Sequence, residues 1–299
     1  MGKTLIFGAT GNLSGATADI LHRLAPSSLR VATSRASGLE TLRERFPDAE
    51  HVVADWNDEA SLVAAMNGAS KLLVIPPDLV IDEHIATPNI INAARASGSI
   101  ELLVRLLAIP PGLTVEQVPQ EYIDTRCGAG LHVVAKPLLD ASGLPICYVN
   151  VPAWIMFNLA LFVATEVPST RRIALPAITD AARMWVSERD IAEVLAKILS
   201  EPATDHAGKE YQLTSAERHT YADVAQLFSS ILGKEVSYVD DDKPLRAAMG
   251  DAFDILMTYL RHEAGSYSGV RHQETIAELL GRPQESLADY IRTNQRQFQ

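Results

Sequence analysis

A glycine-rich stretch near the start of the chain carries the first residues whose types and spacing suggest chemistry. Residues 8–15 read GATGNLSG and lie between an apolar run at 3–7 and a segment of helical periodicity at 12–24. In a dinucleotide-binding fold, such a turn brings the backbone and the N–H groups of the following helix to a pyrophosphate. The contacts that we expect with a cofactor come from Gly8, Thr10, Gly11, Asn12 and Leu13.

The third position of this glycine motif departs from the usual pattern. Ser14 stands three residues after Gly11, and Gly15 follows it. Glycine turns between strands and helices are common, so a turn without a ligand is the alternative interpretation. The position of the loop at the start of an alternating strand–helix series favours the nucleotide.

The end of the expected second strand indicates which dinucleotide would bind. An acidic residue there would hold the ribose hydroxyls of NAD, but no Asp or Glu stands between Leu24 and Gly38. Ser34 and Arg35 stand there instead, and a guanidinium makes charge-assisted, often bidentate contacts with phosphate. We therefore expect Ser34 and Arg35 to bind the 2′-phosphate of NADP(H). A solvated loop arginine is the alternative.

Two further pairs of residues follow expected strands. Asp55 and Trp56 come after the third strand, where the adenine ring would lie, and the Asp55 carboxylate could meet its amino group. Pro76 and Pro77 come after the fourth strand, near the nicotinamide end. Ligands of parallel sheets bind at the carboxyl ends of the strands, which is the basis for both assignments. Asp55 could equally cap the following helix.

His132 and Lys136 are the first candidates for proton transfer. They stand four residues apart in an expected helix, so they would share one face. A histidine with an ordinary pKa near 6.5 can give a proton to a reduced carbonyl at neutral pH. An exposed His/Lys face with no catalytic role is the alternative.

The composition excludes several other classes of protein. Of the 299 residues, 47% are apolar, and 26 basic against 37 acidic residues give a net charge of −11 with no basic cluster, which argues against nucleic acid as a partner. Cys127 and Cys147 form no disulfide framework or metal motif. The N-terminus does not read as a signal peptide, and the longest apolar stretch, 151–164, is too short to span a membrane. We expect a reduced, cytoplasmic, metal-free protein.

The elements that would position these residues alternate between strands and helices. This alternation predicts an α/β fold, a Rossmann doubly wound parallel sheet with both faces covered. The expected strands are 3–7, 29–33, 50–54, 71–75, 100–107 and 145–149. The expected helices are 12–24, 38–46, 57–66, 83–96 and 132–142.

After residue 150 the pattern loosens. Short strands are expected at 172–176, 184–186, 210–214 and 236–239, helices at 190–199 and 221–232, and mostly helix thereafter. The sequence thus predicts an NAD(P)-binding domain at 1–150 and a smaller C-terminal α/β substrate lobe at 151–299 within the same compact body.

These stretches together resemble a known family. GATGNLSG (8–15), TSR (33–35), KLLVIPP (71–77) and PAWIMFN (152–158) resemble the NmrA-like branch of the atypical short-chain dehydrogenase/reductases. TYADVA (220–225) and the tail from Gly281 look most like the fungal clavine (ergot-alkaloid) dehydrogenases. The resemblance spans nearly the whole chain. It implies NADPH laid across the strand ends and a substrate cleft beneath the C-terminal lobe, in reductases or in non-catalytic redox sensors.

The chain departs from that family where chemistry would be expected. Leu107 stands where members often have Ser, and Val151 and Phe157 replace the Arg and the acidic residue of an R-P-x-W/F-x-x-E-N motif. The Tyr-x-x-x-Lys pair of short-chain dehydrogenases is absent; the nearest string starts at Tyr122 and carries Arg126 in place of the Lys. The resemblance therefore makes Tyr122 a further catalytic candidate and places His132 near the substrate.

These losses favour an acceptor that needs no acid. An iminium ion already carries the charge that hydride neutralises, so binding and orientation suffice. Trp154, Met156 and Phe157 would line an apolar pocket for such a substrate, with cation–π help from Trp154. A purely structural core role is the alternative for these aromatic residues.

The first hypothesis is therefore an NADPH-dependent reductase of a bulky hydrophobic secondary metabolite, such as an alkaloid-type imine, iminium or conjugated carbonyl. One alternative is a redox-neutral enzyme in which NADP(H) is not consumed while the substrate cyclises or rearranges. Another is a non-catalytic NADP(H) sensor. The expected partner is a small hydrophobic substrate, without nucleic acid or membrane, in a monomer or homodimer.

Overall fold

The structure is a computed structural model that describes residues 2–299. The chain divides into two compact units, and neither is continuous in sequence. Unit 1 runs from the amino terminus to Ile109 and takes in Arg126–Asn150 and Ile191–Gln212. Unit 2 comprises Pro110–Thr125, Val151–Asp190 and Leu213–Gln299. The two units therefore do not coincide with the predicted domains, 1–150 and 151–299. Residues 110–125 belong to unit 2, and residues 191–212 belong to unit 1.

Unit 1 is built on a seven-stranded sheet in the order β10-β6-β5-β4-β1-β2-β3, and every neighbouring pair is parallel. This order is the one expected of a doubly wound Rossmann sheet, in which the strand order reverses next to β1. The strands are β1 (Lys3–Ile6), β2 (Leu29–Thr33), β3 (Glu50–Val53), β4 (Ala69–Val74), β5 (Leu102–Leu107), β6 (Ile146–Asn150) and β10 (Glu210–Gln212).

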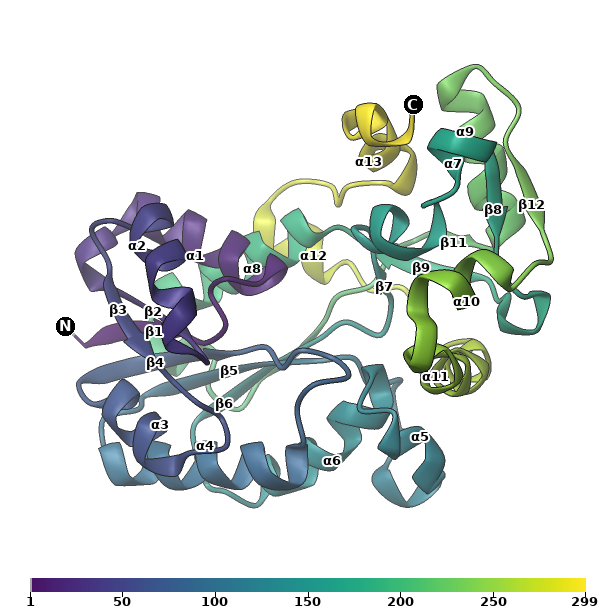
Figure 1. The fold of residues 1–299 in the computed structure, drawn as a ribbon. Coiled ribbons are helices and arrows are strands. Elements are labelled where there is room, and N and C mark those ends of the chain that lie inside the picture. Colours follow the sequence, from purple (N-terminus) through teal and green to yellow (C-terminus); the bar gives the residue numbers. More distant parts are fainter. Residues whose placement is uncertain (1) are drawn as a thin grey trace. The chain divides into compact units, whose positions relative to one another are not determined.

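Helices cover both faces of this sheet. In Figure 1, α3, α4 and α6 lie on one face and α1, α2 and α8 on the other. The central strands are accordingly buried on both faces: β5 is buried along its whole length. The helices are α1 (Asn12–Leu24), α2 (Leu39–Arg45), α3 (Glu59–Met66), α4 (Glu83–Ser97), α6 (Gly128–Asp140) and α8 (Glu188–Ser200), the last beginning in unit 2.

Unit 2 holds short strands and several helices around its own apolar core. It contains a three-stranded sheet in the order β11-β9-β7 and a parallel pair, β12 and β8. The strands are β7 (Trp154–Ile155), β8 (Arg172–Ala174), β9 (Arg183–Val186), β11 (Arg218–His219) and β12 (Ser237–Val239). The helices are α5 (Gln120–Asp124), α7 (Val167–Thr170), α9 (Tyr221–Leu232), α10 (Lys243–Met249), α11 (Phe253–Ser266), α12 (Thr275–Leu280) and α13 (Leu287–Thr293).

Local signals explain several helix ends. Asp58 caps α3 by accepting a hydrogen bond from the Ala60 N–H (3.0 Å). Thr220 and Asp223 form a capping box at the start of α9, and Gly233 ends that helix in the left-handed region (φ +65°). Among the described residues, no helix combines the length and apolar character needed to cross a membrane.

The α/β architecture predicted from the alternation is confirmed. The six strands expected before residue 150 all form, and their ends shift by at most two residues. One expectation about the second half is wrong: the strand expected at 210–214 does not belong to the C-terminal lobe, because β10 pairs with β6 at the edge of the main sheet.

Candidate active site

The glycine loop of unit 1 makes the turn that its sequence predicts. Gly8 adopts a positive φ of 63°, a conformation that a side chain would strain, and its carbonyl accepts a hydrogen bond from the Gly11 N–H (2.8 Å). Gly15 then lies so close to the loop that a Cβ there would stand 3.0 Å from the Ala9 carbonyl oxygen. Gly15 therefore provides the close helix–loop packing for which the motif normally uses the preceding position, here Ser14.

The start of α1 is open to an anionic ligand. Gly11 is the N-cap, no side chain caps the helix, and no acidic residue stands in its first turn. The N–H groups of a first helical turn have no partner within the helix, and they carry the positive end of its dipole. Thr10, Gly11 and Asn12 are exposed, whereas the Leu13 side chain is buried, so Leu13 could offer a ligand only its backbone.

Backbone hydrogen bonds hold the neighbouring strand ends together around this loop. The Ala9 N–H donates to Ala32 of β2 (3.0 Å), and the Ala54 N–H donates to Thr33 (2.9 Å). On the other side, the Phe7 N–H donates to Leu73 of β4 (3.1 Å). The loops after β1, β2, β3 and β4 therefore follow the same carboxyl edge of the sheet, where ligands of such sheets bind.

Arg35 is positioned for an external partner. Ser34 and Arg35 are exposed just past the end of β2, and the Arg35 side chain has no hydrogen bond or ion pair with another described residue. Arg30, five residues earlier, is different: it is buried and bonds to the carbonyls of Ala65 and Asn67 (2.7 Å each) and to Glu50 (2.9 Å). Of these two arginines, only Arg35 has its guanidinium available for a phosphate.

Asp58, and not Asp55, caps the next helix. The Asp55 carboxylate accepts a hydrogen bond from the Asn57 N–H (3.0 Å), which forms a tight local turn. The neighbouring Trp56 is buried and packs against Phe7 (5.7 Å between ring centroids), so its ring is part of the core of unit 1.

The two prolines after β4 differ in exposure. Pro76 is buried, whereas Pro77 begins an exposed loop. Of this pair, Pro77 is therefore the better placed to meet a ligand.

His132 lies in the interior of unit 1, so the alternative interpretation of an exposed His/Lys face does not hold for this residue. It is 4% exposed, and its Nδ1 has no hydrogen-bond partner among the described residues. Burial, together with the nearby charge of Arg105, holds the pKa of His132 well below 6.5. The folded protein therefore keeps this imidazole neutral at physiological pH, which removes the imidazolium acid that the sequence suggested.

The charge near His132 belongs to a buried cluster that sequence reasoning missed. Arg105 of β5 forms an ion pair with Glu83 at the start of α4, and the Thr87 hydroxyl donates to the same carboxylate. Both charged side chains are 1% exposed. The available signal was an arginine in the middle of an otherwise apolar strand, LLVRLL (102–107), because a buried charge requires a partner.

The neutral state of His132 predicts a pH-dependent contribution to stability. Unfolded His132 takes up a proton near pH 6.5 and folded His132 does not, so the free energy of unfolding should fall as the pH decreases below about 6.5, by up to about 1.4 kcal/mol per pH unit. Above that pH His132 is neutral in both states, so the free energy of unfolding is not lowered by this residue. Urea unfolding of the wild type and of His132→Gln at several pH values checks this; parallel pH profiles for the two proteins would contradict it.

Lys136 is held by its own surroundings. Its ammonium group pairs with Asp140 (3.0 Å) and Glu210 (3.8 Å) and lies 4.4 Å from the centre of the Tyr148 ring. These contacts hold Lys136 over the edge of unit 1 that α6, β6 and β10 form. The Lys136 ammonium is therefore paired with side chains of the protein itself.

Tyr122 belongs to unit 2, unlike His132 and Lys136. Its ring is buried and stacks on His262 of α11 (5.1 Å between centroids), with Tyr259 nearby (6.0 Å). His262 in turn lies 3.0 Å from Glu121. These contacts fasten α5 to α11, which gives Tyr122 a clear structural role.

The apolar stretch after β6 forms core rather than an open pocket wall. Trp154 and Met156 are buried in the main core of unit 2. The Arg183 guanidinium lies 4.5 Å from the centre of the Trp154 ring, and Trp185 packs edge-on against it (5.4 Å). The Arg183 cation thus already occupies the face of the Trp154 ring, and this argues against the expected cation–π contact of Trp154 with a substrate. Phe157 is only half-buried and stays the better candidate of the three.

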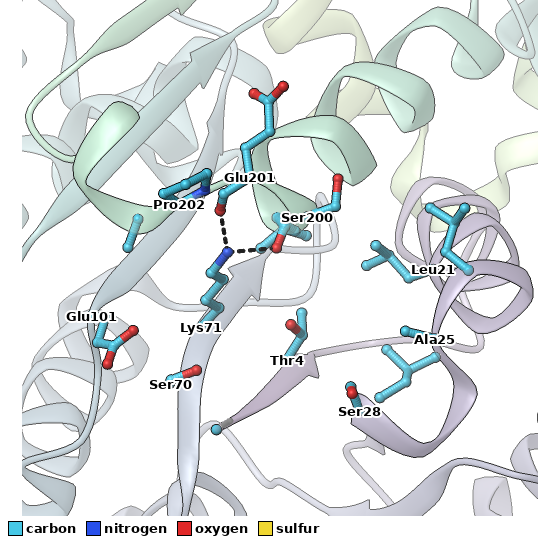
Figure 2. Close-up of a pocket in the computed structure, with 15 residues that line it drawn as sticks. Thr4, Leu21, Ala25, Ser28, Ser70, Lys71, Glu101, Ser200, Glu201 and Pro202 are labelled. Atoms are coloured by element: carbon cyan, nitrogen blue, oxygen red, sulfur yellow. Dashed lines mark hydrogen bonds between the residues drawn. The ribbon is translucent and has the colours of Figure 1, made fainter.

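A cavity of about 530 Å³ lies at the opposite, amino-terminal edge of the sheet in unit 1 (Figure 2). It is lined by Thr4, Ser70 and Lys71 at the starts of β1 and β4, and by residues that follow α8. Lys71 donates to the carbonyls of Leu199 (2.8 Å) and Glu201, and so caps the end of α8. None of the predicted site residues lines this cavity.

No metal centre is formed by the described part of the chain: residues 2–299 contain no group of three or more His, Cys, Asp or Glu side chains arranged to hold an ion.

No known family model matches the chain. Individual proteins, in contrast, are similar to it in sequence. Quinone oxidoreductase 2 of Escherichia coli strain K12 is 25% identical over 301 residues, which cover 96% of each chain.

Solved structures extend this similarity. The triphenylmethane reductase of Citrobacter sp., complexed with NADP(H), superposes with a TM-score of 0.78 at 20% identity, over 97% of this chain and 99% of that one. NmrA, a negative transcriptional regulator solved with NADP, gives a TM-score of 0.74 at 18% identity, over 97% and 94%. The chain therefore shares its fold, over almost its whole length, with reductases and a regulator that have been solved with NADP(H) or NADP, and its unit 1 has the Rossmann architecture.

Proposed function

We propose that this protein is an NADPH-dependent reductase that transfers hydride to a bulky, apolar, conjugated acceptor. The observation that carries the proposal is the carboxyl edge of the sheet in unit 1. There the start of α1 has neither a side-chain cap nor an acidic residue, and Arg35 stands exposed without a protein partner. Reductases of quinones and of triphenylmethane dyes share this fold, which supports the choice of acceptor.

The residues present fit NADPH. The first turn of α1, with Gly8 and Gly11, would hold the pyrophosphate, and Ser34 and Arg35 would hold the 2′-phosphate. Asp55 would meet the adenine amino group, and the nicotinamide end would lie toward Pro77. When bound, NADPH supplies the hydride, and the protein supplies position and orientation.

The state of the candidate acids bears on the acceptor. His132 is neutral, Lys136 is ion-paired and Tyr122 is packed against α11, so none presents itself as a strong proton donor. An iminium ion needs no acid, because hydride neutralises its charge. A quinone gains a hydride and then one proton, which water can supply to the resulting oxyanion. We infer that the acceptor is one of these two types, such as an alkaloid-type iminium or a quinone.

The proposal is tested by binding and then by turnover. Calorimetry should show NADPH binding much more tightly than NADH. Purified protein should then oxidise NADPH in the presence of 1,4-naphthoquinone or an N-methylated cyclic iminium ion, as followed by the loss of reduced-nicotinamide absorbance. Tight NADPH binding without oxidation by either acceptor would overturn the reductase proposal.

The same observations favour one second candidate, an NADP(H)-sensing regulator. A neutral His132 and the lack of an available acid would suit a protein that binds the dinucleotide without turnover. The NmrA regulator solved with NADP has this fold. In that case NADPH would bind and not be consumed, and association with a protein partner would respond to the ratio of NADPH to NADP⁺. Product formed without NADPH oxidation would point instead to a redox-neutral enzyme.

A further inference from the structure

The loop that follows β4 exposes apolar side chains at the carboxyl edge of unit 1. Leu79 is 41% exposed and Val80 66%, and Ile85 in the first turn of α4 is also exposed. Apolar side chains gathered on one short loop are worth explaining, since water does not favour such a grouping. The loop leaves the sheet between β1, which ends in the glycine loop, and β5.

Leu79 is also held in an uncommon backbone conformation. Its φ is +65°, in the left-handed region that costs a branched side chain free energy. The described chain has only two other non-glycine residues of this kind, Arg126 and Arg171. A glycine or asparagine would adopt the same turn at a lower cost in free energy. The backbone conformation therefore does not explain why a leucine stands here.

Contacts with the start of α6 keep the loop in this shape. The Leu79 N–H donates to the Arg126 carbonyl (2.7 Å), and the Arg126 guanidinium pairs with Asp82 (2.8 Å). The Asp78 carboxylate accepts a hydrogen bond from the Gly128 N–H (3.0 Å). These three contacts fasten both ends of the Leu79–Val80 pair. Strain that the surroundings maintain in this way is concentrated at functional sites in proteins.

We propose that Leu79 and Val80 are specificity-determining residues that contact the flat apolar face of the hydride acceptor. The proposal rests on the proposed function, and it names the part of the acceptor site that unit 1 supplies. A rigid apolar surface beside the nicotinamide end would bind fused-ring acceptors better than small ones. It would lose little conformational entropy on binding, since the loop is already fixed.

The test compares Leu79→Gly with Leu79→Met, and uses Arg171→Gly as the matched control. Glycine relieves the strained φ and removes the side chain, whereas methionine keeps an apolar surface. Arg171 has nearly the same φ (+56°), is exposed and lies at the end of α7 in unit 2. The readouts are the Kd of 1,4-naphthoquinone for the NADP⁺-loaded protein, the Kd of the smaller 1,4-benzoquinone, the Kd of NADPH, and the Tm.

Leu79→Gly should weaken naphthoquinone binding about tenfold and benzoquinone binding less than about threefold, with NADPH binding unchanged and Tm equal or higher. Leu79→Met and Arg171→Gly should keep the wild-type affinity. Unchanged naphthoquinone affinity in both Leu79→Gly and Val80→Ser, or no naphthoquinone binding to the wild type, would overturn the inference. If the wild type binds naphthoquinone through Leu79 but never oxidises NADPH, the proposed reductase function fails, and Leu79 and Val80 stand as the contact for a flat apolar ligand that is not reduced.

Discussion

Replacement of Gly11 by aspartate should abolish NADPH binding while the protein still folds. Gly11 is the N-cap of α1 with extended backbone (φ −81°, ψ 174°), a conformation in which aspartate is a preferred cap. The new carboxylate would occupy the place where we expect the pyrophosphate, and repulsion between charges a few ångströms apart should raise the Kd of NADPH about 100-fold or more. Calorimetry and thermal unfolding measure the two effects separately.

Gly11→Asn is the control for this variant, because asparagine has nearly the same shape and also caps helices. A Cβ at position 11 would stand 3.2 Å from the Gly8 carbonyl oxygen, so both variants share one small steric effect. Gly11→Asn should therefore bind NADPH at least about tenfold more tightly than Gly11→Asp. Equal losses in the two variants would mean that crowding, and not charge, governs this position. NADPH binding retained by Gly11→Asp would place the cofactor elsewhere.

The second large effect is expected from Arg35→Glu, which should remove the preference for NADPH over NADH. The exposed guanidinium would otherwise make charge-assisted bonds to the 2′-phosphate, which NADH lacks. Loss of those bonds together with new repulsion should weaken NADPH about 100-fold and NADH less than about threefold. Titrations of both dinucleotides against wild type and variant give the ratio directly.

Arg43→Glu provides a matched control for the charge itself. Arg43 is exposed in α2, and its substitution changes the net charge by the same amount. It should alter NADPH binding much less than Arg35→Glu does, because an exposed charge that does not contact the phosphate is screened by salt. If Arg43→Glu weakened NADPH binding as much as Arg35→Glu, the loss would come from the change in overall charge and not from a lost contact with the 2′-phosphate.

Periodic apolar patterns predicted most of unit 1. Runs such as KTLI, LRVAT and LLVRLL formed β1, β2 and β5, and the glycine turn took its expected conformation at Gly8. These features depend on neighbours in sequence, such as strand-forming runs, caps and turn glycines. Sequence reasoning reaches them because a few residues decide them locally.

The features that were missed depend on distant partners. His132 reads as an ordinary helical histidine until β5 brings Arg105 near it, and that arginine needs Glu83 from another helix. Trp154 reads as a pocket aromatic until Arg183 of β9 is found over its ring. The strand at 210–212 reads as part of the C-terminal lobe, because its own residues do not indicate that it pairs with β6.

The late position of β10 in the chain affects how the protein is synthesised. β10 pairs with β6 through residues 210–212, so the sheet lacks its last strand until those residues have left the ribosome. At typical translation speeds, the roughly sixty residues between the two strands take about 3 to 12 seconds to make. During that interval Ile146–Asn150 is an unpaired edge, able to pair with strands of other nascent chains. Weaker initiation, which spaces the ribosomes on one message farther apart, should therefore raise the yield of folded protein.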